Sequence, residues 1–182
     1  MREAIIERLE NLGVSPELVV FIIALLPVIE LRGAVPVGIN FYHLVWYKTV
    51  ILALLGNLLP VPFLLLLLAK IAQVLSKIPL FAKFFDWLFT RTRKKSKVIE
   101  EYKFWGLLIF VAIPLPGTGA WTGSVAAFLL GMDFKLSLLA ISLGVFLACI
   151  LVTSLSLLGL WGLIIAGIAL AILLIGRLIK SS

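Results

Sequence analysis

The sequence is poor in the residues that most often build metal sites and catalytic centres. Its 182 residues include one cysteine, Cys149, and one histidine, His43. An intramolecular disulfide therefore cannot form, and a zinc site made from cysteine and histidine is not expected. We find no nucleophile beside a base and no phosphate-cradling loop that follows a strand. We therefore expect no cofactor, no metal and no enzymatic activity.

Charge is also scarce, because only 14% of the residues are Asp, Glu, Lys or Arg. The net charge of +7 is concentrated in the run RTRKKSK at residues 91–97. Beside a membrane segment, such a run is typical of a cytoplasmic flank, and it can also attract anionic lipid. Nucleic acid is not an expected partner.

Apolar residues, in contrast, make up 63% of the chain. Runs such as LWGLIIAGIALAILLIG are long enough to cross a hydrocarbon core of about 30 Å. The chain is therefore predicted to be an integral membrane protein with a single membrane domain, residues 1–182. We expect it in a cell membrane, the prokaryotic inner or plasma membrane, with several membrane passes.

The predicted fold is all-α, with two apolar segments that are broken at their centres. Proline and glycine interrupt residues 17–45 and again residues 103–132. The pieces, for example residues 17–27 and 34–43, would each reach about 15 Å at 1.5 Å per residue. That is half a bilayer, so each segment is predicted to form a re-entrant helical hairpin. The expected segments are an amphipathic helix (1–14), hairpin 1 (17–45), a transmembrane helix (47–78), an interfacial basic helix (79–101), hairpin 2 (103–132) and two transmembrane helices (134–158 and 160–178).

The two halves match at a separation of about 87 residues. Gly33 falls on Gly119, Lys48 falls on Lys135, and Gly56 falls near Gly144. One true crossing between equivalent points would invert the second copy, and an inverted pair of broken helices is the pattern of a transporter. The alternative is two hairpins that are similar by composition alone. The N-terminus is outside if both basic ends are cytoplasmic, and inside if the first hairpin crosses fully.

The motif ELRGAVPVG at residues 30–38 contains a carboxylate and a guanidinium in an otherwise apolar stretch. Glu30 and Arg32 carry the only charges between Leu18 and Tyr47, and charges at membrane depth usually mark function. One interpretation is a structural ion pair; it would need non-helical backbone, because residues two apart do not share a helix face.

The other interpretation is a transport site, in which Glu30 carries a proton and Arg32 binds an anion. Helix starts near Ala34 and Gly119 would direct their free N–H groups at the same anion. We expect Glu30 to couple transport to protons and the following residues to bind substrate: Arg32, Gly33, Gly117, Thr118, Gly119, Trp121 and Thr122.

Three further residues have predicted structural roles. Ser15 is expected to cap a helix that begins at Pro16, because proline is favoured at the first helical position. Asp133 is expected to cap the helix that follows it, and Asn57 is expected to bridge helices.

The motif ELRGAVPVG, followed some 85 residues later by PLPGTGAWTG, resembles the small multidrug export protein family, which is similar to the DedA superfamily of VTT-domain membrane proteins. The resemblance covers nearly the whole chain. It implies two re-entrant hairpins in an inverted repeat, each packed on spanning helices, and a role in moving lipids or small molecules. DedA relatives include undecaprenyl-phosphate translocases and lipid scramblases. They place arginines in the second hairpin region, where residues 116–119 here carry no charge.

Three functions are therefore considered. The first is a proton-coupled transporter or flippase for an amphiphile with an anionic head group, such as a polyprenyl phosphate or phospholipid. The second is an exporter of small lipophilic cationic drugs, with Glu30 as the counter-ion. The third is an uncoupled lipid scramblase. The expected partners are membrane lipids, protons and a lipid-phosphate or small-molecule substrate, and a homodimer is left open.

Overall fold

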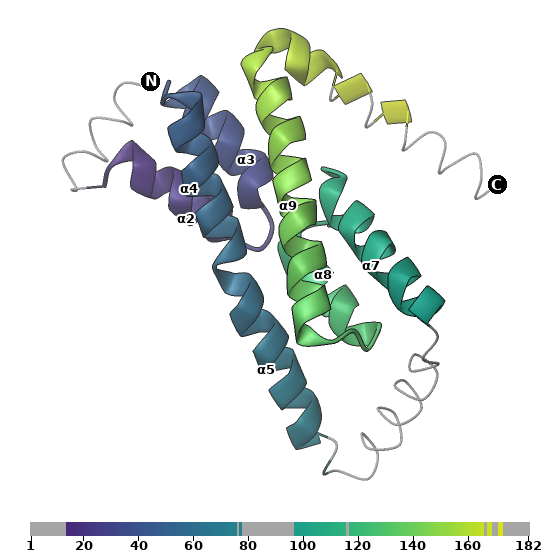
Figure 1. The fold of residues 1–182 in the computed structure, drawn as a ribbon. Helices are drawn as coiled ribbons and strands as arrows, with labels where there is room; N and C mark the ends of the chain where they lie inside the picture. Colours follow the sequence, from purple (N-terminus) through teal and green to yellow (C-terminus); the bar gives the residue numbers. More distant parts are fainter. Residues whose placement is uncertain are drawn as a thin grey trace.

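The computed structural model describes residues 14–75, 77, 97–115, 117–165, 167, 168, 171 and 172. Every regular element within these residues is a helix (Figure 1). The helices predicted at residues 1–14 and 79–101 lie almost wholly outside the described residues, as does much of the helix predicted at 160–178. The helices described with their bounds are α2 (Pro16–Leu25), α3 (Glu30–Pro36), the π-helix η1 (Val37–Phe41), α4 (Trp46–Leu58), α5 (Pro60–Leu75), α7 (Lys97–Ala112), α8 (Ala120–Leu129) and α9 (Phe134–Leu157).

Two long apolar helices form the centre of the fold and run side by side in opposite directions (Figure 1). Helices α4 and α5 follow each other directly, and together Trp46–Ala72 form one candidate membrane span of 27 residues. The helix is interrupted at Leu59, immediately before Pro60, because proline lacks the N–H group that a helix interior needs. The second candidate span is α9, with 24 residues. Both are long enough to cross a bilayer.

Helix starts follow the predicted capping residues. The hydroxyl of Ser15 accepts a hydrogen bond from the Leu18 N–H at 3.3 Å, with Pro16 at the first position of α2. A carboxylate oxygen of Asp133 accepts from the N–H groups of Lys135 and Leu136 at the start of α9. Both caps are confirmed. They satisfy N–H groups that have no partner within the helix itself.

The outer faces of the central helices are apolar. Large side chains remain exposed along α4, α5 and α9, among them Ile51, Leu55, Phe63, Leu66, Leu143, Phe146 and Ile150. Exposed apolar surface of this extent marks a region that contacts lipid or another protein. Trp46 and Tyr47 are exposed at the first turn of α4, where amphipathic aromatic rings suit a membrane–water interface.

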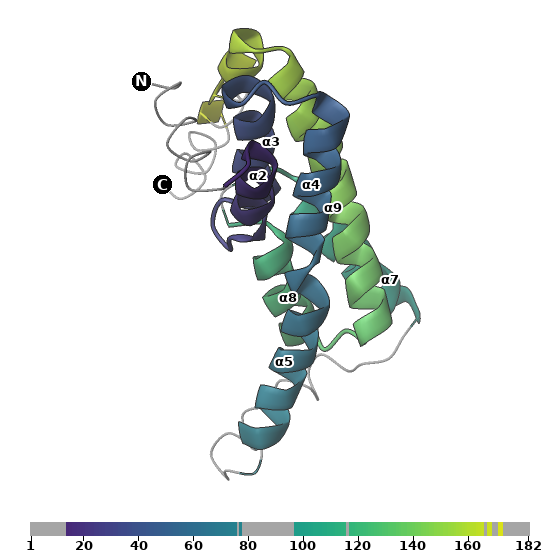
Figure 2. The same cartoon turned by 90° about the vertical axis from the view of Figure 1, so that its left-hand side faces the viewer.

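Two pairs of shorter helices lie against the central helices. Helices α2 and α3 pack against each other and against α4, whereas α8 packs against α5, and α7 packs against α9 (Figure 2). Buried residues from both pairs join one core, including Val20, Ala24, Leu31, Val35, Val111, Ala120, Ile141 and Val145. The start of α3 and the start of α8 therefore approach each other inside the protein.

Two predicted boundaries are wrong. Helix α3 begins at Glu30 rather than near residue 34, because Gly33 does not break the chain. The Gly33 N–H donates to Ile29 O at 3.2 Å, and a β-carbon on Gly33 would overlap the Ile29 side chain, so this glycine allows close packing. No boundary separates residues 101 and 103 either, since α7 is continuous from Lys97 to Ala112.

Candidate substrate site

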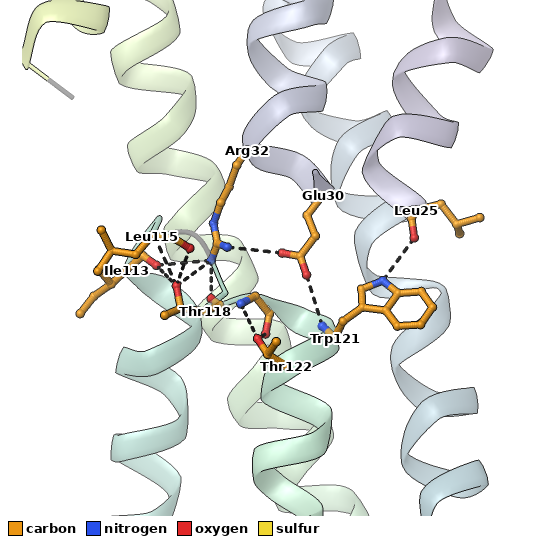
Figure 3. Close-up of polar contacts among 9 residues, drawn as sticks. Leu25, Glu30, Arg32, Ile113, Leu115, Thr118, Trp121 and Thr122 are labelled. Atoms are coloured by element: carbon orange, nitrogen blue, oxygen red, sulfur yellow. Dashed lines mark hydrogen bonds and ion pairs between the residues drawn. The ribbon is translucent and has the colours of Figure 1, made fainter. Parts of the chain in front are cut away.

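The polar groups of the two sequence motifs meet where the first turn of α3 faces the first turn of α8 (Figure 3). Glu30 and Arg32 come from α3. Thr118 and Gly119 precede α8, and Trp121 lies in its first turn. The fold thus brings together residues that are more than 80 positions apart in the sequence.

Glu30 is the most buried charged group described at this site, with 3% of its side chain exposed. Its Oε1 accepts a hydrogen bond from the backbone N–H of Trp121 at 3.3 Å, and its Oε2 lies 3.8 Å from Nη1 of Arg32. The backbone of Glu30 has φ = 54°, in the left-handed region that residues other than glycine rarely adopt. The ion pair thus forms with the non-helical backbone that a two-residue spacing requires. Backbone strain of this kind is often stored at functional sites.

Arg32 joins α3 to the loop that follows α7. Its Nη2 donates to the carbonyl oxygen of Thr118, to the Thr118 hydroxyl at 3.2 Å and to the carbonyl oxygen of Ile113 at 3.3 Å. The Thr118 hydroxyl in turn lies 2.7 Å from Ile113 O and 2.9 Å from Leu115 O. The planar guanidinium has enough donors to hold this loop and Glu30 together.

The start of α8 approaches the Glu30 carboxylate through a glycine. The Gly119 N–H donates to the Thr122 hydroxyl at 2.8 Å, which caps the helix. A β-carbon on Gly119 would overlap both carboxylate oxygens of Glu30, so a larger residue has no room at this position. The N–H groups of a helix start favour negative charge, and here the charge is supplied by the protein's own carboxylate.

Trp121 makes a second connection between the two helix pairs. Its indole Nε1–H donates to the carbonyl oxygen of Leu25, the last residue of α2, at 3.2 Å. This carbonyl has no acceptor role within α2, because the last turn of a helix leaves its C=O groups free. Figure 3 shows the Glu30 carboxylate above the first turn of α8 and the indole beside that turn, directed toward Leu25.

The predicted site residues divide into two groups. Glu30, Arg32, Thr118, Gly119 and Trp121 share the contacts described above. The other three residues do not take part in these contacts or already have a structural role. Gly33 packs against Ile29, Gly117 adopts a turn with φ = 83°, and the Thr122 hydroxyl caps α8.

A narrow cavity adjoins the ion pair, too narrow for a water molecule in this conformation. Its lining includes Glu30, Arg32 and Gly119, together with residues from the two central helices: Asn57, Val145 and Ala148. Asn57 was expected to bridge helices, and this is wrong, since neither amide atom has a hydrogen-bond partner among the residues described. Its place at the site was missed, although it is the only amide side chain between Thr49 and Lys70.

The arrangement has the parts to bind an anion and to carry a proton. A carboxylate shielded from water can be neutralised by a proton when its partners leave. A guanidinium and a helix start can then hold an oxyanion in its place. In the conformation described, the carboxylate occupies those donors, so the site is closed.

Comparison with known proteins gives one match. Residues 30–151, about two thirds of the chain, match the model of a family described as "Putative small multi-drug export protein". No curated protein and no solved structure matches the chain.

Proposed function

Because the chain belongs to the small multi-drug export protein family, whose name indicates a membrane transporter, we propose that it is a proton-coupled transporter for an amphiphile with an anionic head group. The observation that carries this proposal is the Glu30 carboxylate, buried against Arg32 and the start of α8. A polyprenyl phosphate or a phospholipid has the required head group. The family match itself supports the broader statement that the chain is a membrane exporter.

The proposed architecture is an inverted repeat in which α2–α3 and α7–α8 are re-entrant hairpins. Helices α2 and α8 have ten residues each, about 15 Å at the usual rise, which reaches half a bilayer. In both pairs the helix that follows the break begins at the same buried site, at Glu30 and at Ala120, whereas residues 26–29 of the first break are exposed. Irregular backbone at membrane depth is tolerated where it is buried in protein or lines a water-filled cavity.

Close packing at two glycines supports the repeat. Gly56 of α4 packs against the backbone of α2, and Gly144 of α9, 88 positions later, packs against the backbone of α7. The contacted residues stand 87 positions apart: Phe21 and Ala24 in α2, Leu108 and Val111 in α7. These paired contacts support the repeat over two hairpins that are similar by composition alone.

Hydrogen bonds in the first turns of the central helices recur as well. The Thr49 hydroxyl donates to Val45 O at 3.3 Å in α4. The Ser137 hydroxyl donates to Asp133 O at 2.7 Å in α9, again 88 positions later. The same bond to the carbonyl four residues earlier also forms at Ser124, Ser154 and Ser156, so this recurrence does not by itself support the repeat.

Substrate binding is coupled to protonation because the substrate head group and Glu30 compete for the same hydrogen-bond donors. An anionic head group that enters the site needs the Arg32 guanidinium and the N–H groups of α8, which Glu30 occupies in the closed conformation. When the substrate displaces the carboxylate, Glu30 loses the partners that stabilise its charge, and a charge without partners at this depth takes up a proton. Binding of the anion and of the proton is therefore linked.

A second candidate is an exporter of lipophilic cations, which the family's description favours. In that case Glu30 would be the counter-ion of the drug, and Arg32 would have to move away. The site favours the anion, because Glu30 and Arg32 offset each other for a ligand of either charge, whereas the N–H groups at the start of α8 favour negative charge.

The test is transport by purified protein in liposomes with an imposed pH gradient. We expect Glu30→Gln to remove the dependence of flux on the gradient, because an amide cannot carry the proton. Glu17→Gln is the matched control, since Glu17 pairs with Lys48 at the start of α2, away from the site. Undiminished proton-coupled flux in Glu30→Gln would overturn the proposal.

Substrate class is tested in the same liposomes. A fluorescent lipid phosphate and a lipophilic cation such as tetraphenylphosphonium are compared at equal concentration. Faster movement of the phosphate supports the anion, and faster movement of the cation supports the exporter. Lipid movement that is independent of any proton gradient identifies an uncoupled scramblase.

A further inference from the structure

Asn57 is a buried polar side chain that the contacts described so far do not explain. It lies in α4 with 1% of its surface exposed, and neither Nδ2 nor Oδ1 has a hydrogen-bond partner among the described residues. Buried amides are nearly always satisfied, because leaving them unpaired is unfavourable. A buried amide in this condition needs a partner that is absent from this conformation.

Arg32 also has a side-chain donor that is left unpaired among the described residues. Its two terminal nitrogens face Glu30 and the loop after α7, whereas its Nε is buried and has no hydrogen-bond partner in the part of the chain that the structure describes. Arg32 and Asn57 line the same narrow cavity, next to Glu30 and Gly119. Two side chains with unpaired N–H groups, one from α3 and one from α4, therefore line the same cavity.

Packing does not require an amide at this position. Val145, 88 positions later, also lines the cavity, one residue after Gly144, as Asn57 follows Gly56. An apolar side chain thus fills the corresponding place in the second central helix. The polar group distinguishes one side of the cavity from the other.

We propose that Asn57 is a substrate-binding residue whose Nδ2 group, together with the Arg32 Nε–H, donates to the oxygens of a phosphate-type head group in the open site. The proposal rests on the proposed function and narrows its substrate to a molecule with a phosphate-type head group. Two donors that line one cavity suit an anion with several oxygens, which a quaternary ammonium group does not offer. Asn57 and Glu30 line the same cavity, and the Glu30 carboxyl group becomes a donor for the remaining acceptor, Oδ1, once it is protonated.

The first test measures ligand stabilisation in detergent, independently of transport. Hexyl phosphate is the probe, and hexyltrimethylammonium is its charge-reversed control. We expect hexyl phosphate to raise the melting temperature of the wild type by several degrees and that of Asn57→Leu by much less. Asn40→Leu makes the same change at an exposed position and should respond as the wild type does. Equal stabilisation of Asn57→Leu and wild type would overturn the assignment.

A structural role for Asn57 predicts a different result. If the amide held the fold together, Asn57→Leu and Asn57→Val would both melt earlier without ligand. If it binds substrate, both should melt at or above the wild-type temperature, since an unpaired buried amide is removed. A lower melting temperature in both variants would contradict the proposal.

The second test measures transport of a lipid phosphate. We expect Asn57→Leu to raise KM about tenfold or more while a proton gradient still drives the residual flux. A wild-type KM in Asn57→Leu, with Glu30→Gln uncoupled, would reject the role of Asn57 and leave the proposed function in place. Absence of proton-coupled flux in the wild type would reject the proposed function itself, and the melting test would then decide on Asn57 alone.

Discussion

Gly119 and Glu30 are in such close contact that a β-carbon at residue 119 would overlap both oxygens of the carboxylate. We therefore expect Gly119→Ala to force the Glu30 side chain away from the Trp121 N–H and from Arg32. Overpacking of a buried position costs about 1–3 kcal/mol. The change should lower the free energy of unfolding by this amount, as measured by SDS titration in mixed micelles, and should also abolish the dependence of transport on a pH gradient.

Gly106 provides the control for this substitution. It is exposed in α7, and no atom lies within 4 Å of the place where its β-carbon would stand. Gly106→Ala should leave transport unchanged and change stability by at most about 1 kcal/mol, in the stabilising direction, because alanine favours a helix. Gly119→Ala with wild-type coupling would show that the close approach of Glu30 is not needed for function.

The indole of Trp121 should contribute to stability through one hydrogen bond. Trp121→Phe keeps an aromatic ring but removes the Nε1–H that donates to Leu25 O. A hydrogen bond of this kind contributes about 0.5–1.5 kcal/mol net, so the free energy of unfolding should fall by that amount. Trp105→Phe, on the exposed face of α7, serves as the control and should have little effect. Equal stability of Trp121→Phe and wild type would mean that water or another donor replaces the indole.

The fold could be predicted from sequence where a local signal determines it. Caps at Ser15 and Asp133 follow from side-chain chemistry, and the long apolar runs identified the candidate spans. The role of Gly33 could not be predicted, because the sequence does not distinguish a glycine that permits close packing from a glycine that ends a helix. The contact with Ile29 that distinguishes them exists only after α3 has formed.

The candidate site could be predicted in part. The isolated charges of Glu30 and Arg32 indicated their own importance, and Gly119 and Trp121 followed from the second motif. The role of Thr122 depends on the position of its hydroxyl relative to the Gly119 N–H, which spacing alone does not determine. Asn57 is distant in sequence from both motifs, so only the packing of α4 against α3 brings it to the cavity.

The ion pair of Glu17 and Lys48 should make stability depend on pH below neutrality. Lys48 Nζ donates to Glu17 Oε1 at 2.6 Å, and this hydrogen bond lowers the pKa of Glu17 below its ordinary value of 4.5. A carboxylate with a lowered pKa in the folded state stabilises the fold above its unfolded pKa, and this contribution is lost as pH falls through the folded pKa.

The expected effect is a few tenths of a kcal/mol, because Lys48 is half exposed and surface pairs contribute little. It is measured as the difference in melting temperature between pH 6 and pH 3 for wild type and Glu17→Gln. The wild type should lose more stability than the variant over this range. A larger loss of stability in Glu17→Gln than in the wild type would contradict the expected direction of the effect.

Thr122 allows its predicted role as a substrate ligand to be separated from its role as a cap. Its hydroxyl accepts from the Gly119 N–H at 2.8 Å, so Thr122→Val should lose about 1 kcal/mol of stability, typical for the loss of a helix cap. Thr122→Ser keeps the hydroxyl and should remain close to wild type. If capping is its whole role, KM for a lipid phosphate should not change in either variant. A raised KM in Thr122→Val with unchanged stability would instead place Thr122 among the ligands, because the hydroxyl would then have to leave Gly119 when substrate enters.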